Sequence, residues 1–257
     1  MITLHEVSKS FGSFVALKDI TLEITPGQYW MIIGPNGAGK TTLLKLIATL
    51  AKPSQGEIII QTTSRSAAQL NGPAARNQNQ TTGAQQSAKT QPLAIRQQIG
   101  FIGHQSFLYN NLTAEENLRF YARMYHLPNA QRQIERTLQL IGLSARRHDL
   151  VRTFSRGMQQ RLSIGRALLA DPKIILLDEP FTGLDQSAIE NFVNLFTSLI
   201  SPDRTIVMTT HDLDLGLKLA SHFVILSKGR LVWQGLTREY DPLAFKSLYR
   251  RLTEEPS

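Results

Sequence analysis

Hydrophobic and polar residues alternate near the N-terminus in the two-residue period of β-strands. The pattern predicts strands at residues 2–7, 14–24, 29–33 and 56–60. Pro26 and Gly27 form a turn signal before the third of these strands, which is uniformly apolar. A helical pattern follows it directly, at 41–50. A buried strand that runs into a helix is thus predicted early in the chain.

The second half of the chain alternates between strands and helices. A strand is predicted at 99–102, and an all-helical block follows at 107–165. Helices are predicted there at 113–125, where Thr113 and Glu116 form a capping box, at 128–141, and after Ser155 to about 170. Beyond the block we expect strands at 173–177, 205–209, 223–226 and 231–233, with helices at 186–200 and 213–220. This order predicts an α/β fold with a mostly parallel sheet covered on both faces.

Residues 61–91 differ in composition from the rest of the chain. Gln, Thr, Ala, Asn and Ser dominate the segment, Leu70 is its one large aliphatic residue, and it has neither aromatic nor acidic residues. Such a segment buries too little apolar surface to offset the entropy of ordering it. It is predicted to be a disordered surface insertion, with a tether for RNA or a partner as the functional alternative.

Composition limits the class of protein. The chain has 257 residues, a net charge of +8 and no cysteine, which excludes disulfides and thiolate metal sites. Its basic residues are spread along the sequence, so no specific nucleic-acid partner is expected. No run approaches 18 apolar residues, and Met1-Ile2-Thr3-Leu4-His5 lacks the features of a signal peptide. We therefore expect a cytoplasmic protein that does not span the membrane.

The segment after the strand at 29–33 has the G-x-x-x-x-G-K-[ST] pattern of a phosphate-binding P-loop. Backbone N–H groups of such a turn and the start of the next helix surround a polyphosphate, here expected to be ATP. Lys40 reaches the outer phosphates, and the Thr41 hydroxyl is a ligand for Mg²⁺. The candidate nucleotide-binding residues are Gly34, Pro35, Asn36, Gly37, Ala38, Gly39, Lys40, Thr41 and Thr42.

Two carboxylates end the apolar strand at 173–177. Asp178 is placed to hold Mg²⁺ through water, and Glu179 to polarise a water for attack on the γ-phosphate. The alternative is a strand that simply ends in acidic loop residues. Because buried carboxylates are costly without a partner, the P-loop in the same chain favours the catalytic interpretation.

A second candidate anion site opens the helix after Phe154. Ser155 is a predicted N-cap and Gly157 permits close approach of the backbone. Together with the P-loop and Asp178-Glu179, this segment resembles the signature sequence LSGGQ of the ABC ATPases. The resemblance implies roles for four further residues: Phe11 stacks on adenine, Gln105 contacts Mg²⁺ and the attacking water, Asp185 lies in the D-loop, and His211 contacts the γ-phosphate.

The signature departs from the usual family pattern at three positions. Arg156 stands at the first signature glycine, Met158 replaces glutamine and Phe154 replaces leucine. Ser155 and Gly157, the pair expected to touch phosphate, are kept. The other histidines have no metal-ligand spacing and are expected to be structural: His5, His126, His148 and His222.

The resemblance implies a P-loop NTPase of the ABC-ATPase fold, with a RecA-like core, an antiparallel β subdomain and an inserted α-helical subdomain. It covers the chain as one domain: core about 1–60, 92–106 and 166–236, insertion 61–91, helical subdomain about 107–165, tail about 237–257. In that family the signature of one subunit completes the ATP site of another. The resemblance therefore implies an ATP-hydrolysing homodimer or heterodimer, peripheral on the inner face of the membrane through a separate permease.

Two segments of the sequence bear on which molecule is transported. The segments 99–118 and 154–161 resemble the haem-exporter ATPase of cytochrome c biogenesis. Exporters of lipids, polysaccharides or drugs share parts of these segments and stay open as alternatives. A soluble ABC ATPase acting on ribosomes or DNA is disfavoured because the chain has a single P-loop and no sustained heptads. A GTP-specific switch is disfavoured by Asp178-Glu179 and the signature.

Overall fold

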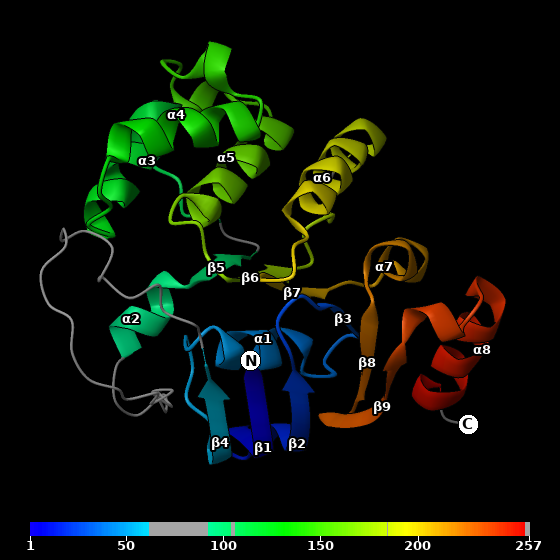
Figure 1. The fold of residues 1–257 in the computed structure, drawn as a ribbon. Coiled ribbons are helices and arrows are strands. Elements are labelled where there is room, and N and C mark those ends of the chain that lie inside the picture. Colours follow the sequence, from blue (N-terminus) through cyan, green and yellow to red (C-terminus); the bar gives the residue numbers. More distant parts are fainter. Residues whose placement is uncertain (62–91, 104–105, 184, 255–257) are drawn as a thin grey trace, which may run out of the picture.

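A computed structural model of the protein describes residues 1–61, 92–103, 106–183 and 185–254 (Figure 1). The predicted insertion therefore lies outside the described residues, apart from Gln61. The same holds for the candidate site residue Gln105.

An antiparallel three-stranded sheet forms one layer. Its order is β2-β1-β4, and its strands are β1 (Ile2–Phe11), β2 (Phe14–Ile24) and β4 (Gln55–Ile60). The first strand extends four residues beyond the predicted 2–7 and ends in a tight hairpin, where Phe11 pairs with Phe14. The hairpin sets both aromatic residues at one end of this sheet.

The core sheet has six strands in the order β5-β6-β7-β3-β8-β9, of which β9 alone is antiparallel to its neighbour. The mostly parallel sheet predicted from the sequence is thereby confirmed. Its strands are β3 (Tyr29–Ile33), β5 (Ile99–Ile102), β6 (Ile174–Asp178), β7 (Thr205–Thr209), β8 (His222–Ser227) and β9 (Arg230–Leu236).

Successive residues of the central strands point to opposite faces of the sheet, and each face belongs to a different hydrophobic core. Helix α1 (Lys40–Ile47) packs between the two sheets, where it contacts the face that carries Trp30 and Ile32. Met31 and Ile33 point to the opposite face, which is covered by α6 (Gln186–Leu199), α7 (Leu213–Leu219) and part of α5 (Arg156–Leu168). The central strands are buried on both faces and lie between helices in Figure 1, as a parallel sheet requires.

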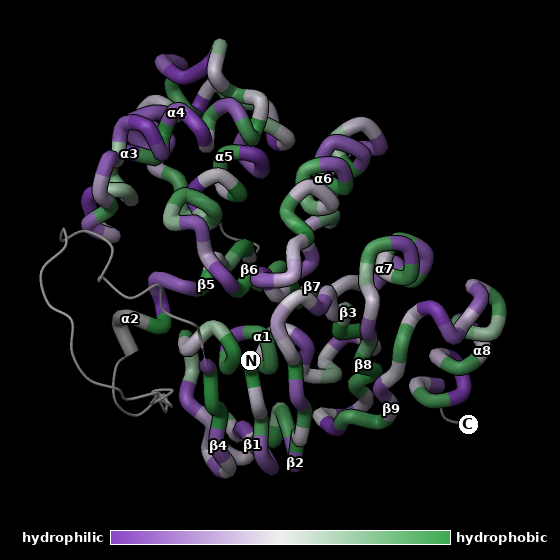
Figure 2. Tube along the Cα trace, in the orientation of Figure 1, coloured by the Kyte–Doolittle hydropathy of each residue, from purple (hydrophilic) through white to green (hydrophobic). Residues whose placement is uncertain are grey.

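The helical subdomain lies beyond the β5 edge of the core sheet in Figure 1, and α5 joins it to that sheet. It contains α3 (Ala114–Met124), α4 (Ala130–Leu140), α5 and the short turns η2 (Ser144–Arg146) and η3 (Val151–Thr153). Hydrophilic residues cover most of α4 in Figure 2, while Ile134 and Leu138 reach the small core. The predicted capping box at Thr113 is present. Helix α4 begins two residues later than predicted because Asn129 has a left-handed conformation, φ 53°.

Two helices were not anticipated from the sequence. Helix α2 (Pro92–Gln97) precedes β5, and α8 (Pro242–Thr253) lies in the segment for which only a tail was predicted. Asp241 caps α8, and Phe245 and Leu248 are buried with Phe223 in the outer core. The C-terminal segment thus belongs to the fold. None of the described helices is long and apolar enough to cross a membrane.

A buried carboxylate ties the helical subdomain together. Glu115, on the first turn of α3, is 5% exposed and accepts hydrogen bonds from Arg147 at 2.6 Å and from Arg119 at 2.5 Å. The bond from Arg147 is the main cause that lowers the pKa of Glu115, and desolvation opposes it. The folded state therefore favours the ionised carboxylate.

We expect Glu115→Gln to destabilise the protein by about 1–3 kcal/mol near neutral pH, since charge-assisted hydrogen bonds are lost. That loss corresponds to a fall of about 2–8 °C in melting temperature. Because the folded-state pKa lies below the unfolded value of about 4.3, the contribution is present above that pH and disappears as the pH falls through the folded-state pKa. Thermal unfolding at pH 7 and pH 3 checks both points, with exposed Glu57→Gln as control. A deficit that stays unchanged at pH 3 would contradict the ionic origin.

Candidate functional site

The P-loop is held in place by close backbone packing. Gly39 has φ 101°, and a Cβ built on it would lie 2.6 Å from Leu17 Cδ2 and 2.7 Å from the Ala16 carbonyl oxygen. A larger residue therefore cannot join the loop to α1 without moving β2. The Lys40 Nζ donates to the carbonyl oxygens of Gly34 at 2.8 Å and Pro35 at 3.1 Å, so the ammonium lies inside the loop.

A cavity of about 240 Å³ opens at this loop. Glu179 lines one part of it, and Phe14 and Ala16 from β2 line another. The loop contributes Asn36, Gly37, Ala38, Gly39, Lys40, Thr41 and Thr42. The cavity thus brings the predicted phosphate-binding residues and Glu179 to one place.

One aromatic residue of the β1–β2 hairpin lines this cavity. Phe14, which is 62% exposed, lines the cavity, whereas Phe11 pairs with it across the hairpin and lies outside the lining. Lys9 Nζ lies 4.9 Å from the centre of the Phe11 ring. The hairpin pairing places Phe14 beside the loop, and the adenine-stacking role implied for Phe11 stays a prediction.

Asp178 meets the P-loop threonine at the end of β6. The Asp178 Oδ1 accepts hydrogen bonds from Thr41 Oγ1 at 3.0 Å and from Thr209 Oγ1 at 2.8 Å, and Asp178 is only 4% exposed. A hydroxyl and a carboxylate oxygen that converge beside a phosphate site are suitable ligands for Mg²⁺, which commonly takes its other ligands from phosphates and water. No cluster of three or more His, Asp or Glu side chains that could hold a metal is present among the described residues. These two groups therefore suit a metal shared with a nucleotide.

Glu179 has a strained backbone, with φ 49° in the left-handed region. Its N–H donates to the Thr209 hydroxyl at 2.9 Å, which holds the turn against β7. The Glu179 Oε2 accepts from Thr182 Oγ1 at 3.3 Å and lies 3.0 Å from His211 Nδ1. The carboxylate is thus fixed between two elements and faces the cavity, with the predicted His211 next to it.

The charges of the site act on Lys40. Burial lowers the pKa of its ammonium, and the carboxylates of Glu179 and Asp178 partly oppose that shift. An arriving polyphosphate would supply negative charge directly at this ammonium. The loop is therefore electrostatically prepared for an anion.

The predicted signature residues meet at a different cavity, of about 300 Å³. Ser155 is the N-cap of α5, and its hydroxyl accepts from the N–H of Met158 at 3.3 Å. Asp185 caps α6, with Oδ1 accepting from the N–H of Ala188 at 2.8 Å. Ser155, Gly157 and Asp185 all line this cavity. It shares no lining residue with the cavity at the P-loop.

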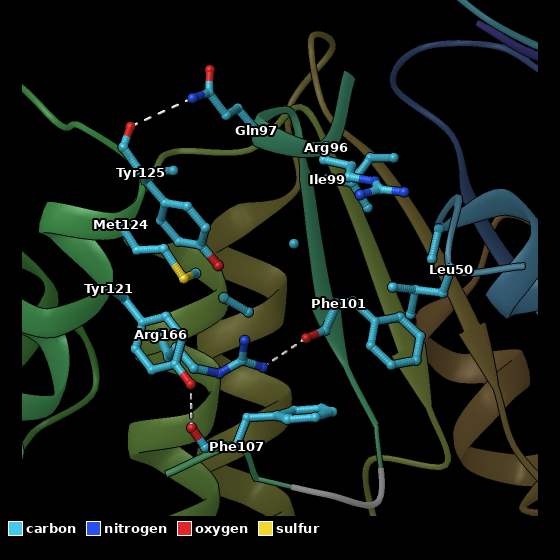
Figure 3. A pocket seen from close by; sticks show the side chains of 14 residues that line it. Leu50, Arg96, Gln97, Ile99, Phe101, Phe107, Tyr121, Met124, Tyr125 and Arg166 are labelled. Atoms are coloured by element: carbon cyan, nitrogen blue, oxygen red, sulfur yellow. Dashed lines mark hydrogen bonds between the residues drawn. The ribbon is translucent and has the colours of Figure 1, made fainter. Parts of the chain in front are cut away.

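A third cavity, of about 300 Å³, lies between the β5 edge of the core and the helical subdomain (Figure 3). Most of its lining is apolar or aromatic, including Phe101, Phe107 and Met124. Arg166, 7% exposed, donates to the Phe101 carbonyl oxygen at 2.9 Å and lies about 5.3 Å from the centre of the Phe107 ring. Its buried Nε has no hydrogen-bond partner among the described residues. We call this cavity the subdomain groove.

The comparisons with known proteins agree with the fold and the P-loop. Residues 17–182 match the sequence profile of the ABC transporter family, and the chain belongs to this family. It is 33% identical to the ABC transporter ATP-binding protein NatA of Bacillus subtilis, over 97% of this chain and 92% of that protein. It is an ATP-binding subunit of ABC type and an ATP hydrolase.

Other relatives have different named cargoes. The chain is 30% identical to the Nod factor export ATP-binding protein I of Cupriavidus metallidurans, over 93% of this chain and 72% of that protein. It is 32% identical to the glutamine transport ATP-binding protein GlnQ of Escherichia coli, over 91% of both chains. A dimeric structure of the ATP-binding cassette MJ0796 bound to ADP and Pi has a TM-score of 0.76 and 26% identity, covering 93% of this chain and all of that chain. The ABC-ATPase fold predicted from the sequence is therefore confirmed.

The geometry makes Glu179 the candidate base. We expect Glu179→Gln to retain ATP binding and to lose at least about 10²-fold in hydrolysis rate, the scale of a lost general base. Lys40→Ala should instead lose affinity for ATP, because the ammonium that faces the phosphates is removed. Equilibrium binding of a fluorescent ATP analogue and phosphate release measure the two effects. Hydrolysis by Glu179→Gln at close to the normal rate would exclude Glu179 as the base.

Proposed function

We propose that the chain is the ATPase subunit of a membrane transporter and that two subunits enclose two ATP molecules head to tail. The observation that carries this proposal is the separation of the P-loop cavity from the signature cavity within one chain. Each cavity offers groups for only one side of a triphosphate. Two copies facing each other in opposite directions bring each P-loop to the other subunit's signature. The dimeric state of the related cassette MJ0796 supports the same arrangement.

In this arrangement each residue has a defined task. Lys40 and the loop amides bind the outer phosphates, and Phe14 or Phe11 packs on the base. Thr41 and Asp178 would hold Mg²⁺ together with Gln105, whose role the family resemblance implies, and the ion would neutralise charge on the phosphates. Glu179 takes a proton from the attacking water, and His211 at 3.0 Å from its carboxylate contacts the γ-phosphate. Ser155 and Gly157 of the partner, with its Asp185, close the site and exclude water.

We further propose that the subdomain groove receives a cytoplasmic segment of the permease. An apolar, aromatic lining suits a hydrophobic anchor of such a segment, and the unpartnered Nε of Arg166 suits a polar group beside it. The groove lies where the core meets the helical subdomain, so a segment bound in it contacts both parts. Docking through this groove holds the subunit at the cytoplasmic face of the membrane.

The finer proposal for the cargo is haem, exported for cytochrome c maturation. The sequence Gly103-His104-Gln105 and the signature variant Ser155-Arg156-Gly157-Met158 support it. Lipid, polysaccharide or drug export is the alternative, and relatives named for Nod factor export and for glutamine transport match over most of the chain. Isolation of the permease that co-purifies with the chain, followed by analysis of haem in the complex, decides between them. A ribosome or DNA as the co-purifying partner would instead support a role outside transport.

The dimer is tested through its signature. In a Glu179→Gln background ATP should drive dimerisation, and Ser155→Arg should abolish it, because the added bulk and the lost N-cap disturb the cavity that faces the partner's phosphates. Ser144→Arg, an exposed serine of η2 outside the cavity, is the matched control. Size-exclusion chromatography with and without ATP provides the measurement. A Ser155→Arg chain that dimerises as readily as its parent would refute the shared site.

The docking surface is tested separately. Met124, 51% exposed in the groove, is replaced by Glu, which places a charge in an apolar lining. We expect co-purification with the permease to fall at least about tenfold, while ATP hydrolysis by the isolated subunit stays within about twofold. Leu140→Glu, on α4 of the same subdomain and 42% exposed, is the matched control. Equal permease recovery with both variants would place the docking surface elsewhere.

A further inference from the structure

Arg156 occupies an unusual position in the signature. It is the first residue of α5, exposed and next to the N-cap Ser155, where the family pattern has a glycine. Among the described residues no carboxylate lies within ion-pair distance of its guanidinium. The side chain extends instead toward the loop at 180–183, which follows Glu179 in the same subunit.

Two observations show how closely Arg156 contacts this loop. Its Nη2 donates to the Thr182 carbonyl oxygen at 3.5 Å, a long hydrogen bond. A Cβ built on Gly183 would lie 2.5–2.6 Å from three atoms of the guanidinium, so the group lies flat against the Gly183 backbone. Gly183 has φ 73°, and the absence of a side chain there makes this approach possible.

A second residue of α5 binds the same loop. Gln160 lies one helical turn after Arg156, on the same face of α5, and its Nε2 donates to the Pro180 carbonyl oxygen at 3.4 Å. The two side chains thus span the loop from its start to its end. The loop in turn contacts the candidate base, because Thr182 donates its N–H to the Glu179 carbonyl oxygen and its hydroxyl to Glu179 Oε2, both at 3.3 Å.

These contacts form one connected path from Arg156 through Thr182 to the carboxylate of Glu179. We propose that Arg156 is a positioning residue for Glu179 of its own subunit. In the proposed dimer the N-terminus of α5 faces the ATP bound to the partner's P-loop, whereas Glu179 faces the ATP bound to the P-loop of its own subunit. Arg156 therefore links the two ATP sites of the dimer: a shift of α5 on meeting the partner's nucleotide is passed to Glu179. This inference rests on the head-to-tail dimer proposed above.

The competing role for Arg156 is a direct contact with the partner's phosphates, since a guanidinium binds phosphate well. The two roles differ in which ATP site suffers when Arg156 is lost. A positioning residue affects the site that contains its own Glu179. A phosphate ligand affects the opposite site.

Heterodimers purified through two different tags separate the roles. One subunit carries Glu179→Gln, so only the other subunit's Glu179 can act, and single-turnover ATP cleavage at that site is measured. With Arg156→Ala in the subunit that keeps Glu179, we expect the rate to fall about three- to tenfold, the scale of a lost hydrogen bond. With Arg156→Ala in the Glu179→Gln subunit, we expect a rate within about twofold of the heterodimer that keeps both arginines.

A loss of rate only when Arg156→Ala is in the Glu179→Gln subunit would overturn the proposal in favour of a phosphate contact. Equal rates in both Arg156→Ala heterodimers and in the heterodimer that keeps both arginines would exclude any positioning role. Arg156→Lys keeps a donor of similar reach, and in the first heterodimer it is expected to recover most of the rate. A Lys variant as slow as Arg156→Ala would contradict the hydrogen-bonded contact. Exposed Arg152→Ala, just before the signature, controls for loss of positive charge. ATP-dependent dimerisation of the unmodified chain is measured first, so that failure of the dimer is distinguished from failure of the Arg156 path.

Discussion

The burial of α1 between two sheets is the constraint on which the site depends. The helix packs its apolar face, with Leu43 and Ile47, into the core shared by the antiparallel sheet and the central strands. The helix thereby contacts β2, β6 and β7, and Gly39 of the loop before it packs against Ala16 and Leu17 of β2. A row of backbone N–H groups is held open toward the cavity, and an anion completes the hydrogen bonding of the helix N-terminus.

Each charged group around this loop is held by hydrogen bonds to neighbouring residues. Lys40 is held by carbonyl oxygens of its own loop, and Asp178 by two threonine hydroxyls. Glu179 is kept in a strained turn by β7 and by the loop that follows it. Each of these groups is thus oriented by hydrogen bonds from its own subunit. In the proposed dimer, the group that closes this cavity from outside comes from the signature of the partner subunit.

Much of this arrangement follows from the sequence. Strands β2 and β3 begin and end where their alternation and apolar run predict, because tight turns bound them on both sides. The P-loop, Asp178, Glu179, Ser155 and His211 are predicted from motif and position. The P-loop, Asp178, Glu179 and His211 lie close together because parallel strands end at one edge of the sheet, whereas Ser155 lies at the separate signature cavity.

The features that could not be predicted depend on packing between distant segments. Helix α8 has 12 residues, and it packs Phe245 against Phe223 of the distant strand β8. Phe14 lines the cavity through the register of a hairpin. The contacts of Arg156 and Gln160 with the loop at 180–183 join residues that lie 20 to 26 positions apart. No local sequence pattern signals such contacts.

The central claim, that each ATP site is shared by two chains, is tested most directly by cross-linking. The chain has no cysteine, so cysteines introduced at Asn36 of the P-loop and Ser155 of the signature give no background. In a Glu179→Gln chain with both substitutions, a short bifunctional thiol reagent should produce a covalent dimer only when ATP is present, and neither single-cysteine chain should do so to the same extent. Equal cross-linking with and without ATP, or cross-links confined to one chain, would contradict the shared site.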